Sequence, residues 1–380
     1  MNAQQSLVDL DPLGQLAVLA LALAAVPLAW LWWRQRHAPV SSRLSALTLL
    51  TLFLTFDLVV FGAFTRLSDS GLGCPDWPGC YGEVSPWGAK AEIAQAEAQL
   101  PDGPVTTRKA WIEMIHRYLA MTVGLLILVT AVVATWHRQH WPRSIVWVWA
   151  TLVWVMIQGL FGKYTVTLKL YPAIVTAHLL GGLLLLALLT VQHEHWKNRA
   201  LVLPSKSRIA LGMAMVLIWI QVALGGWVST NYAVLACTEF PLCQGQWWPP
   251  TQFSQGFTLL RPLGQDAQGG AIAMEALVAI HLAHRWFALL VTVAVVWAAA
   301  RLWTSAPITA RALAAVLALQ ILSGLSNVVL GWPLLAALTH SAGAAALVVL
   351  TTSVWTRSRL HAARDRASLG ATSPPTMDAA

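Results

Sequence analysis

The sequence predicts an all-α polytopic membrane protein, with two pseudo-symmetric four-helix bundles in a parallel repeat plus one extra N-terminal helix. Of the 380 residues, 57% are hydrophobic and only 11% are charged, which excludes an ordinary soluble domain. Apolar runs of the length that a helix needs to cross a bilayer recur along the chain. A set of landmark residues also returns in the same order in the second half, and this order predicts the repeat.

Nine apolar runs are long enough, at about 20 residues each, to span the membrane. They lie near 14–33, 44–65, 111–135, 145–164, 173–192, 208–229, 277–300, 308–330 and 335–355. Basic connectors alternate with acidic or neutral ones, and the positive-inside rule places the basic connectors in the cytoplasm. The net charge of +8 therefore reflects topology rather than nucleic-acid binding. We expect a multi-pass protein of a bacterial-type cell membrane or its equivalent, with the N-terminus outside and the C-terminus cytoplasmic.

The first apolar run allows two interpretations, a cleaved signal peptide or a retained helix. A signal peptide needs a positive segment before the run, but Asp9 and Asp11 precede it and Arg34 follows it. A retained helix that starts outside the membrane fits these charges better. We therefore expect residues 1–43 to contain an extra membrane helix.

All four cysteines lie in the two long connectors on the outer side. Each connector holds one Cys-x5-Cys pair, Cys74 with Cys80 and Cys237 with Cys243. Zinc sites favour closer spacing, and the outer side of the membrane is an oxidising compartment. One disulfide within each connector is the favoured interpretation, and four free thiols are the alternative.

The cysteine pairs belong to an internal repeat, since the second pair follows the first at a distance of 163 residues. The other matched landmarks are Gly62 with Gly225, His116-Arg117 with His284-Arg285, Gln158 with Gln320, Gly162 with Gly324, and His178 with His340. An even number of spans in each unit gives both units the same orientation, so the repeat axis should follow the membrane normal. We place the units at 44–195 and 208–356, followed by a cytoplasmic tail at 357–380.

Four histidines lie inside apolar runs, each about 8 Å below the outer surface if the runs are helical. They are His116, His178, His284 and His340. Within each unit the second and fourth helices bring two imidazoles to one level, which is the arrangement that bis-histidine ligation of a haem iron needs. Histidines that merely form hydrogen bonds within a bundle are the alternative. Ionisable groups at this depth are usually functional, and two matched pairs favour haem.

Residues beside these histidines are further candidates. Arg117 and Arg285 could pair with haem propionates, since guanidinium binds carboxylates in bidentate fashion, or could extend to the interface. Glu113 lies one turn before His116 on the same helix face, whereas its counterpart in the second unit is His281. A carboxylate beside one pocket only is what one reacting and one supporting site would show. A helix N-terminus that favours any acid is the alternative.

Two positions stay undecided at the level of sequence. His281 competes with His284 as a haem ligand, and His284 is favoured because it aligns with His116 through the shared His-Arg pair. Asp57 lies within the second span and has the apolar counterpart Ile220. It either carries protons or bonds a neighbouring helix.

Three features together resemble a known family over about residues 44–355. They are the run Gly62-Ala63-Phe64-Thr65-Arg66-Leu67 leading into Ser70-Gly71-Leu72-Gly73-Cys74-Pro75-Asp76-Trp77-Pro78, the motif Glu113-Met114-Ile115-His116-Arg117, and the histidines on the second and fourth helices of both units. With them the chain resembles the haem A synthase family of cytochrome oxidase assembly proteins. The first span lies outside the eight-span plan expected of that family.

The resemblance implies a set of roles for the candidate residues. His116 and His178 would hold haem O, His284 and His340 would hold haem b, and Glu113 would be the essential acid. The implied reaction oxidises the C8 methyl of haem O to the formyl group of haem A through successive hydroxylations. The implied partners are haem O, the lipid membrane, haem O synthase and cytochrome oxidase subunits, with no nucleic acid.

Two other functional classes remain open. A non-catalytic di-haem protein that passes electrons from a quinol explains four histidines but not the Glu113/His281 difference. A transporter with repeat symmetry would need unwound helices near mid-membrane, whereas the histidines lie near the surface. The haem content of the purified protein separates these classes.

Overall fold

The computed structural model describes residues 7–140 and 142–371, with side chains at 7–139 and 145–362. Over these residues it contains eleven α-helices, two short 3-10 helices (η1, Arg138–His140, and η2, Ala233–Ala236) and no strand. The helices are α1 Leu13–Gln35, α2 Val40–Leu67, α3 Lys90–Gln99, α4 Thr107–Trp136, α5 Pro142–Thr167, α6 Pro172–Lys197, α7 Ser205–Thr230, α8 Phe253–Gly256, α9 Met274–Leu302, α10 Pro307–Val329 and α11 Leu334–Ala371. The all-α prediction is confirmed.

Nine helices of the described part are long and apolar enough to cross a membrane. Each corresponds to one of the predicted spans to within one residue at its ends or extends beyond it, and the first of them, α1, begins at Leu13. The multi-pass prediction is therefore confirmed. The orientation of the termini stays a prediction.

Local sequence signals fix several helix ends. The hydroxyl of Thr106 caps α4 by accepting the backbone N–H of Lys109 at 3.3 Å. Proline opens α6 at Pro172, where its missing N–H costs nothing. Asn198 ends α6 in the left-handed conformation, which asparagine tolerates better than most residues.

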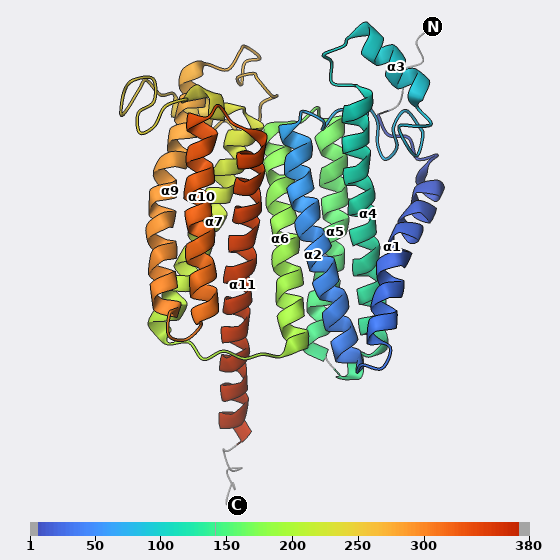
Figure 1. Cartoon of the computed structure of the whole chain (residues 1–380), viewed down its shortest axis with the longest axis vertical. Helices are drawn as coiled ribbons and strands as arrows, with labels where there is room; N and C mark the ends of the chain where they lie inside the picture. Colours follow the sequence, from blue (N-terminus) through green and yellow to red (C-terminus); the bar gives the residue numbers. More distant parts are fainter. Residues whose placement is uncertain (1–6, 141, 372–380) are drawn as a thin grey trace, which may run out of the picture.

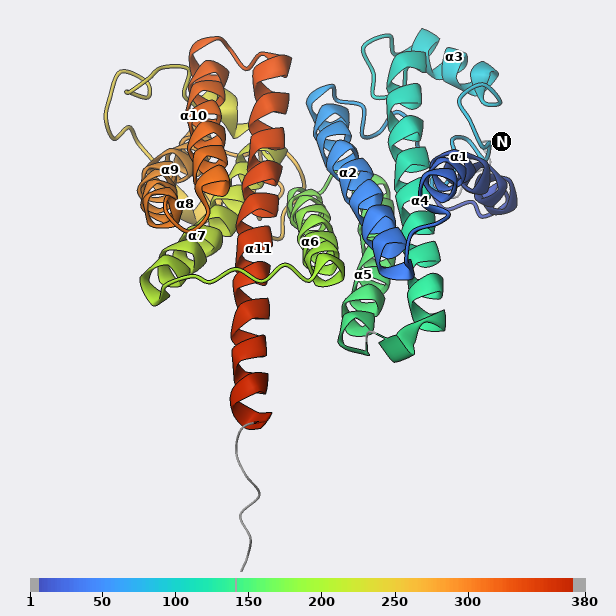
Figure 2. The same cartoon turned by 60° about the horizontal axis from the view of Figure 1, so that its bottom comes forward.

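The nine long helices run side by side, with the two disulfide connectors and the short helices α3 and α8 gathered beyond one end (Figure 1). Helices α2, α4, α5 and α6 contact one another in sequence, as do α7, α9, α10 and α11. Helix α1 packs on the outside against α4 and α2. Helix α11 meets α2 and α6 in the middle of the molecule, where the two sets of helices join (Figure 2).

Contacts between equivalent positions support the predicted repeat. Arg66 donates to the carbonyl oxygen of Ser229 at 2.7 Å, and the Tyr232 hydroxyl bonds the Asp69 carboxylate. Each of these two pairs is separated by 163 residues, the offset of the cysteine repeat. Positions related by a twofold axis touch only beside that axis, so these contacts lie where such an axis would pass. The division into two bundles remains an interpretation that these contacts favour.

Candidate functional site

Each of the four intramembrane histidines packs its ring on a glycine of the preceding long helix. A Cβ atom on Gly62, Gly225 or Gly324 would lie only 3.0–3.1 Å from the ring carbon Cε1 of His116, His284 or His340, respectively. Any residue larger than glycine at these positions would push the imidazole away. These contacts explain why the glycines accompany the histidines in the repeat.

The fourth contact, between Gly162 and His178, is looser. A Cβ atom at Gly162 would lie 3.6 Å from the His178 Cε1, which is an ordinary contact distance. The pairs come from α2 and α4, α5 and α6, α7 and α9, and α10 and α11. All four histidine rings therefore rest on a helix glycine, a contact that we call a glycine seat. Three of these four contacts are tight.

The two histidines of the second unit lie close together. The ring centres of His284 and His340 are 6.4 Å apart, with the ring planes at 74°. A bond between a first-row metal and an imidazole nitrogen is about 2 Å long, so two imidazoles on one metal have ring centres roughly 6 Å apart. The spacing of the pair is therefore one at which His284 and His340 would both be able to hold a single haem iron.

The histidines of the first unit also form a pair. His116 and His178 lie within electrostatic range of each other. Phe61 of α2 stacks beside His116, with ring centres 6.3 Å apart and planes within 9°. His116 and His178 are both partly exposed residues. The Nδ1 atom of each is nevertheless buried and has no hydrogen-bond partner in the described part of the chain. Buried polar atoms are normally paired, so these two Nδ1 atoms are exceptions within the first unit.

The carboxylate of Glu113 is buried, with 4% of the residue exposed, and it joins the helix to the first connector. It accepts the backbone N–H of Cys74 at 2.9 Å and the Arg117 guanidinium at 2.5 Å. Arg117 also donates to the carbonyl oxygens of Asp76, Pro78 and Gly79. The structure thus gives Arg117 partners in the loop and in Glu113, and its predicted pairing with propionates stays a prediction.

In the second unit, the buried His281 stands in the place of Glu113. Its Nδ1 lies 3.0 Å from the carbonyl oxygen of Ala233, and its Nε2 accepts the Arg285 Nε–H at 3.1 Å. Arg285 donates further to the carbonyl oxygens of Cys237 and Leu242 at 3.0 and 3.1 Å. Both ring nitrogens of His281 are thereby engaged, which favours His284 as the ligand of this unit.

Both connectors contain the predicted disulfides, Cys74–Cys80 and Cys237–Cys243, each with a Cα–Cα distance of 4.9 Å. This prediction is confirmed. In the first connector, the Asp76 carboxylate accepts the backbone N–H groups of Tyr81 and Gly82 at 2.6 and 2.7 Å. Burial, together with the nearby Asp76 charge, raises the pKa of the Tyr81 hydroxyl.

The N-terminal segment adds to this connector. Residues Leu7 to Asp9 run beside Trp77, with backbone bonds from Asp9 N–H to Trp77 at 3.0 Å and from Trp77 N–H to Leu7 at 3.2 Å. The extra helix α1 is therefore tied to the first connector as well as to α4. Sequence reasoning placed α1 in the membrane but gave no signal of this pairing.

Two polar residues that sequence reasoning missed lie against the second histidine pair. The Ser323 hydroxyl is 3.1 Å from His340 Nδ1, and the Gln221 amide nitrogen is 3.1 Å from His284 Nδ1. The repeat offered a signal for both, because neither residue has a polar counterpart in the first unit. Asp57, in contrast, is exposed on α2, and none of the described residues bonds it.

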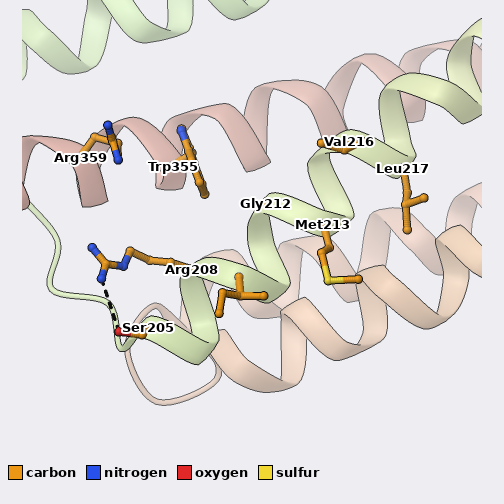
Figure 3. Close-up of a pocket in the computed structure, with 9 residues that line it drawn as sticks. Ser205, Arg208, Gly212, Met213, Val216, Leu217, Trp355 and Arg359 are labelled. Carbon is orange, nitrogen blue, oxygen red and sulfur yellow. Dashed lines mark hydrogen bonds between the residues drawn. The ribbon is translucent and has the colours of Figure 1, made fainter.

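A surface groove of about 710 Å³ lies between the start of α7 and the later turns of α11 (Figure 3). Gly212 and Trp355 form part of its wall, and Arg208, bonded to Ser205, lies across from Arg359. It includes none of the four histidines and lies at the end of the helices away from the disulfide connectors. The histidine pairs are therefore the better candidate site.

Comparison with known proteins gives a consistent result. A family model described as cytochrome oxidase assembly protein matches residues 45–352. A protein of Shewanella oneidensis named heme A synthase is 37% identical over 82% of this chain and 96% of its own length. Proteins of the same name from Caulobacter vibrioides and Beijerinckia indica are 27% and 29% identical, over 80% and 81% of this chain and 93% and 91% of theirs. The family match leaves out α1 and covers both histidine pairs, both disulfides and Glu113, and the chain belongs to this family of cytochrome oxidase assembly proteins.

Proposed function

We propose that the chain is a haem A synthase, an enzyme that oxidises the C8 methyl group of haem O to a formyl group for cytochrome oxidase assembly. Its family and the names of its relatives support this activity. In the proposal, haem O synthase supplies the substrate, and oxidase subunits receive the product. The membrane orientation has the disulfide connectors outside and the C-terminus in the cytoplasm, as the basic connectors indicate.

The two histidine pairs have different roles in this proposal. His116 and His178 hold haem O as substrate, and His284 and His340 hold a resident haem b. The glycine contacts of all four rings and the close spacing of the His284 and His340 rings support these assignments. When bound, the haem irons supply the redox chemistry, and the protein positions the methyl group and handles the released protons.

The observation that carries the enzyme assignment is the difference between Glu113 and His281. Equivalent places in the two units hold a buried carboxylate and a neutral ring, although both groups anchor an arginine and a connector. Glu113 lies one turn from His116, so it shares a helix face with the proposed substrate ligand. A carboxylate there can accept a proton or stabilise positive charge during methyl oxidation.

The haem content of the protein tests the two-site assignment. Purified protein should yield haem b together with haem O or haem A. Replacing His284 or His340 with Met should remove or strongly perturb the bis-histidine absorbance, whereas a His281 variant, as control, should keep its haem. Haem b alone would favour an electron-transfer protein, and an unchanged spectrum with normal haem content in both Met variants would refute the ligand assignment.

Replacement of Glu113 tests the catalytic role. Glu113→Gln keeps the size of the side chain and one carbonyl oxygen, which can accept from either the Cys74 N–H or the Arg117 guanidinium but not from both. We expect the fold and both haems to be retained, and thermal unfolding together with the haem content checks this. We expect formyl production to fall by about 10²–10⁴-fold, the usual size of a general-base effect. Haem O or a hydroxylated intermediate should accumulate and be measurable in pigment extracts. Normal production of haem A by this variant would reduce Glu113 to a structural acid.

A further inference from the structure

The Ser323 side chain lies beside the ring of His340, which also interacts with the backbone of Gln320. Its hydroxyl is buried on α10 and donates to the carbonyl oxygen of Leu319 at 2.7 Å. A hydroxyl has only one proton to donate, so toward His340 Nδ1, at 3.1 Å, the Ser323 oxygen acts as the acceptor. Nδ1 of His340 then carries the proton, and the lone pair is on Nε2, the nitrogen left for a metal.

Gln221 stands in a similar relation to His284. Its amide nitrogen lies 3.1 Å from Nδ1 and 3.3 Å from Nε2 of His284 and donates to the His284 carbonyl oxygen at 3.2 Å. Its amide oxygen is buried without a partner among the described residues. Rotation of the terminal amide exchanges these two atoms, so Gln221 offers an acceptor for an Nδ1–H group. Ser323 thus lies beside Nδ1 of His340, and the Gln221 amide lies beside the ring of His284, slightly nearer to Nδ1 than to Nε2.

The first pair has no such support. His116 and His178 have buried Nδ1 atoms without a hydrogen-bond partner in the described part of the chain. The repeat replaces Gln221 by Leu58, at the offset of 163, and Ser323 by Phe161, at the offset that relates Gly162 to Gly324. Neither hydrocarbon side chain can accept a hydrogen bond. The two units therefore differ in sequence at both positions.

We propose that Ser323 and Gln221 are positioning residues that retain the haem of the second pair, whereas the lack of such partners leaves the haem of the first pair exchangeable. This inference rests on the proposed function and explains how one scaffold holds a cofactor and releases a product. A partner on the second nitrogen fixes the tautomer and ring orientation of a ligating histidine and raises its basicity. Loss of such a partner typically weakens metal binding by about 10–100-fold.

The test measures haem loss rather than turnover. Purified protein with its haem b is mixed with an excess of apomyoglobin, and the rate of haem transfer is followed by absorbance. Ser323→Ala should lose haem b about 10–100-fold faster than the unmodified protein. Ser326→Ala is the matched control, because Ser326 is on the same helix but is partly exposed, and its hydroxyl bonds only the Leu322 carbonyl oxygen.

Two further measurements separate a positioning role from a packing defect. Ser323→Thr restores the hydroxyl and should restore slow transfer. The midpoint potential of the retained haem b should rise in Ser323→Ala and Gln221→Leu, because a less basic ligand stabilises the ferric state less. Transfer rates and potentials unchanged in both variants, in protein that holds haem b through His284 and His340, would overturn the inference and leave the proposed function standing. Protein that contains no haem, or whose His284 and His340 variants keep it, would instead overturn the proposed function.

Discussion

The outer ends of α4 and α9 each hold a disulfide connector in place, but they do so with different side chains. In both, an arginine that follows the haem-ligand candidate reaches over to bind carbonyl oxygens of a disulfide connector. In α4 that arginine is paired with the Glu113 carboxylate, and in α9 with the neutral ring of His281. The second unit shows that anchoring a connector requires no buried carboxylate. This difference supports the proposed chemical role of Glu113 at the first site.

The comparison has its largest expected consequence at the two arginines. Arg117→Gln removes the partner of a buried carboxylate, and breaking a buried ion pair in this way costs about 3–5 kcal/mol. Arg285→Gln leaves only a neutral histidine and two carbonyl groups, so its cost should be nearer the roughly 1.5–3 kcal/mol of hydrogen bonds to a charged group. Thermal unfolding of both variants in detergent measures the difference. Equal destabilisation would mean that Glu113 is neutral in the folded protein. The two units would then not differ in the charge beside their arginines.

The disulfides should have a smaller effect on stability. Each closes a short loop, and the chain-entropy estimate for such a loop is about 2 kcal/mol. Paired Cys→Ser replacement in the first connector should also reduce activity, because Glu113 accepts the backbone N–H of Cys74. The same replacement of Cys237 and Cys243 should leave more activity. Product assays on the two double variants measure this, and a greater loss from the second connector would contradict it.

The pairing itself can be checked chemically. Thiol labelling of denatured, non-reduced protein should find essentially no free cysteine, since both pairs are bonded. Four labelled cysteines would contradict both disulfides and remove the chemical support for an oxidising location.

The sequence predicted the spans, the disulfides and the candidate histidines because these depend on signals that are local or repeated. A run of about 20 apolar residues or a matched His-Arg pair is visible without knowing how the helices turn. The partners of Arg117 were not predictable in this way, because they depend on where the connector folds back over α4. The contacts of Gln221 and Ser323 depend on the rotation of α7 and α10 against their neighbours. The repeat alignment does mark both positions, once polar residues without polar counterparts are sought.

The smallest expected effects on stability come from replacing the glycines that contact the histidine rings, and the glycines compared differ in the space beside the ring. In a helix interior, replacing glycine with alanine gains up to about 1 kcal/mol of helix propensity when space allows. At Gly162 the new Cβ would meet the His178 ring at 3.6 Å, so Gly162→Ala should be neutral or slightly stabilising. At Gly62 the distance to His116 is 3.0 Å, and overpacking of this kind costs about 1–3 kcal/mol, which offsets the gain and displaces the ring.

The displaced ring, rather than the net stability, is the quantity to measure. Gly62→Ala should lower the amount of haem O or haem A that copurifies with the protein, and Gly225→Ala should lower haem b, since its Cβ would also lie 3.0 Å from a histidine ring. Gly162→Ala is the matched control and should keep the pigment content of the unmodified protein. If all three variants retained full haem content, the rings would have room to shift without losing the iron. The glycines would then serve helix packing rather than the placement of the ligands.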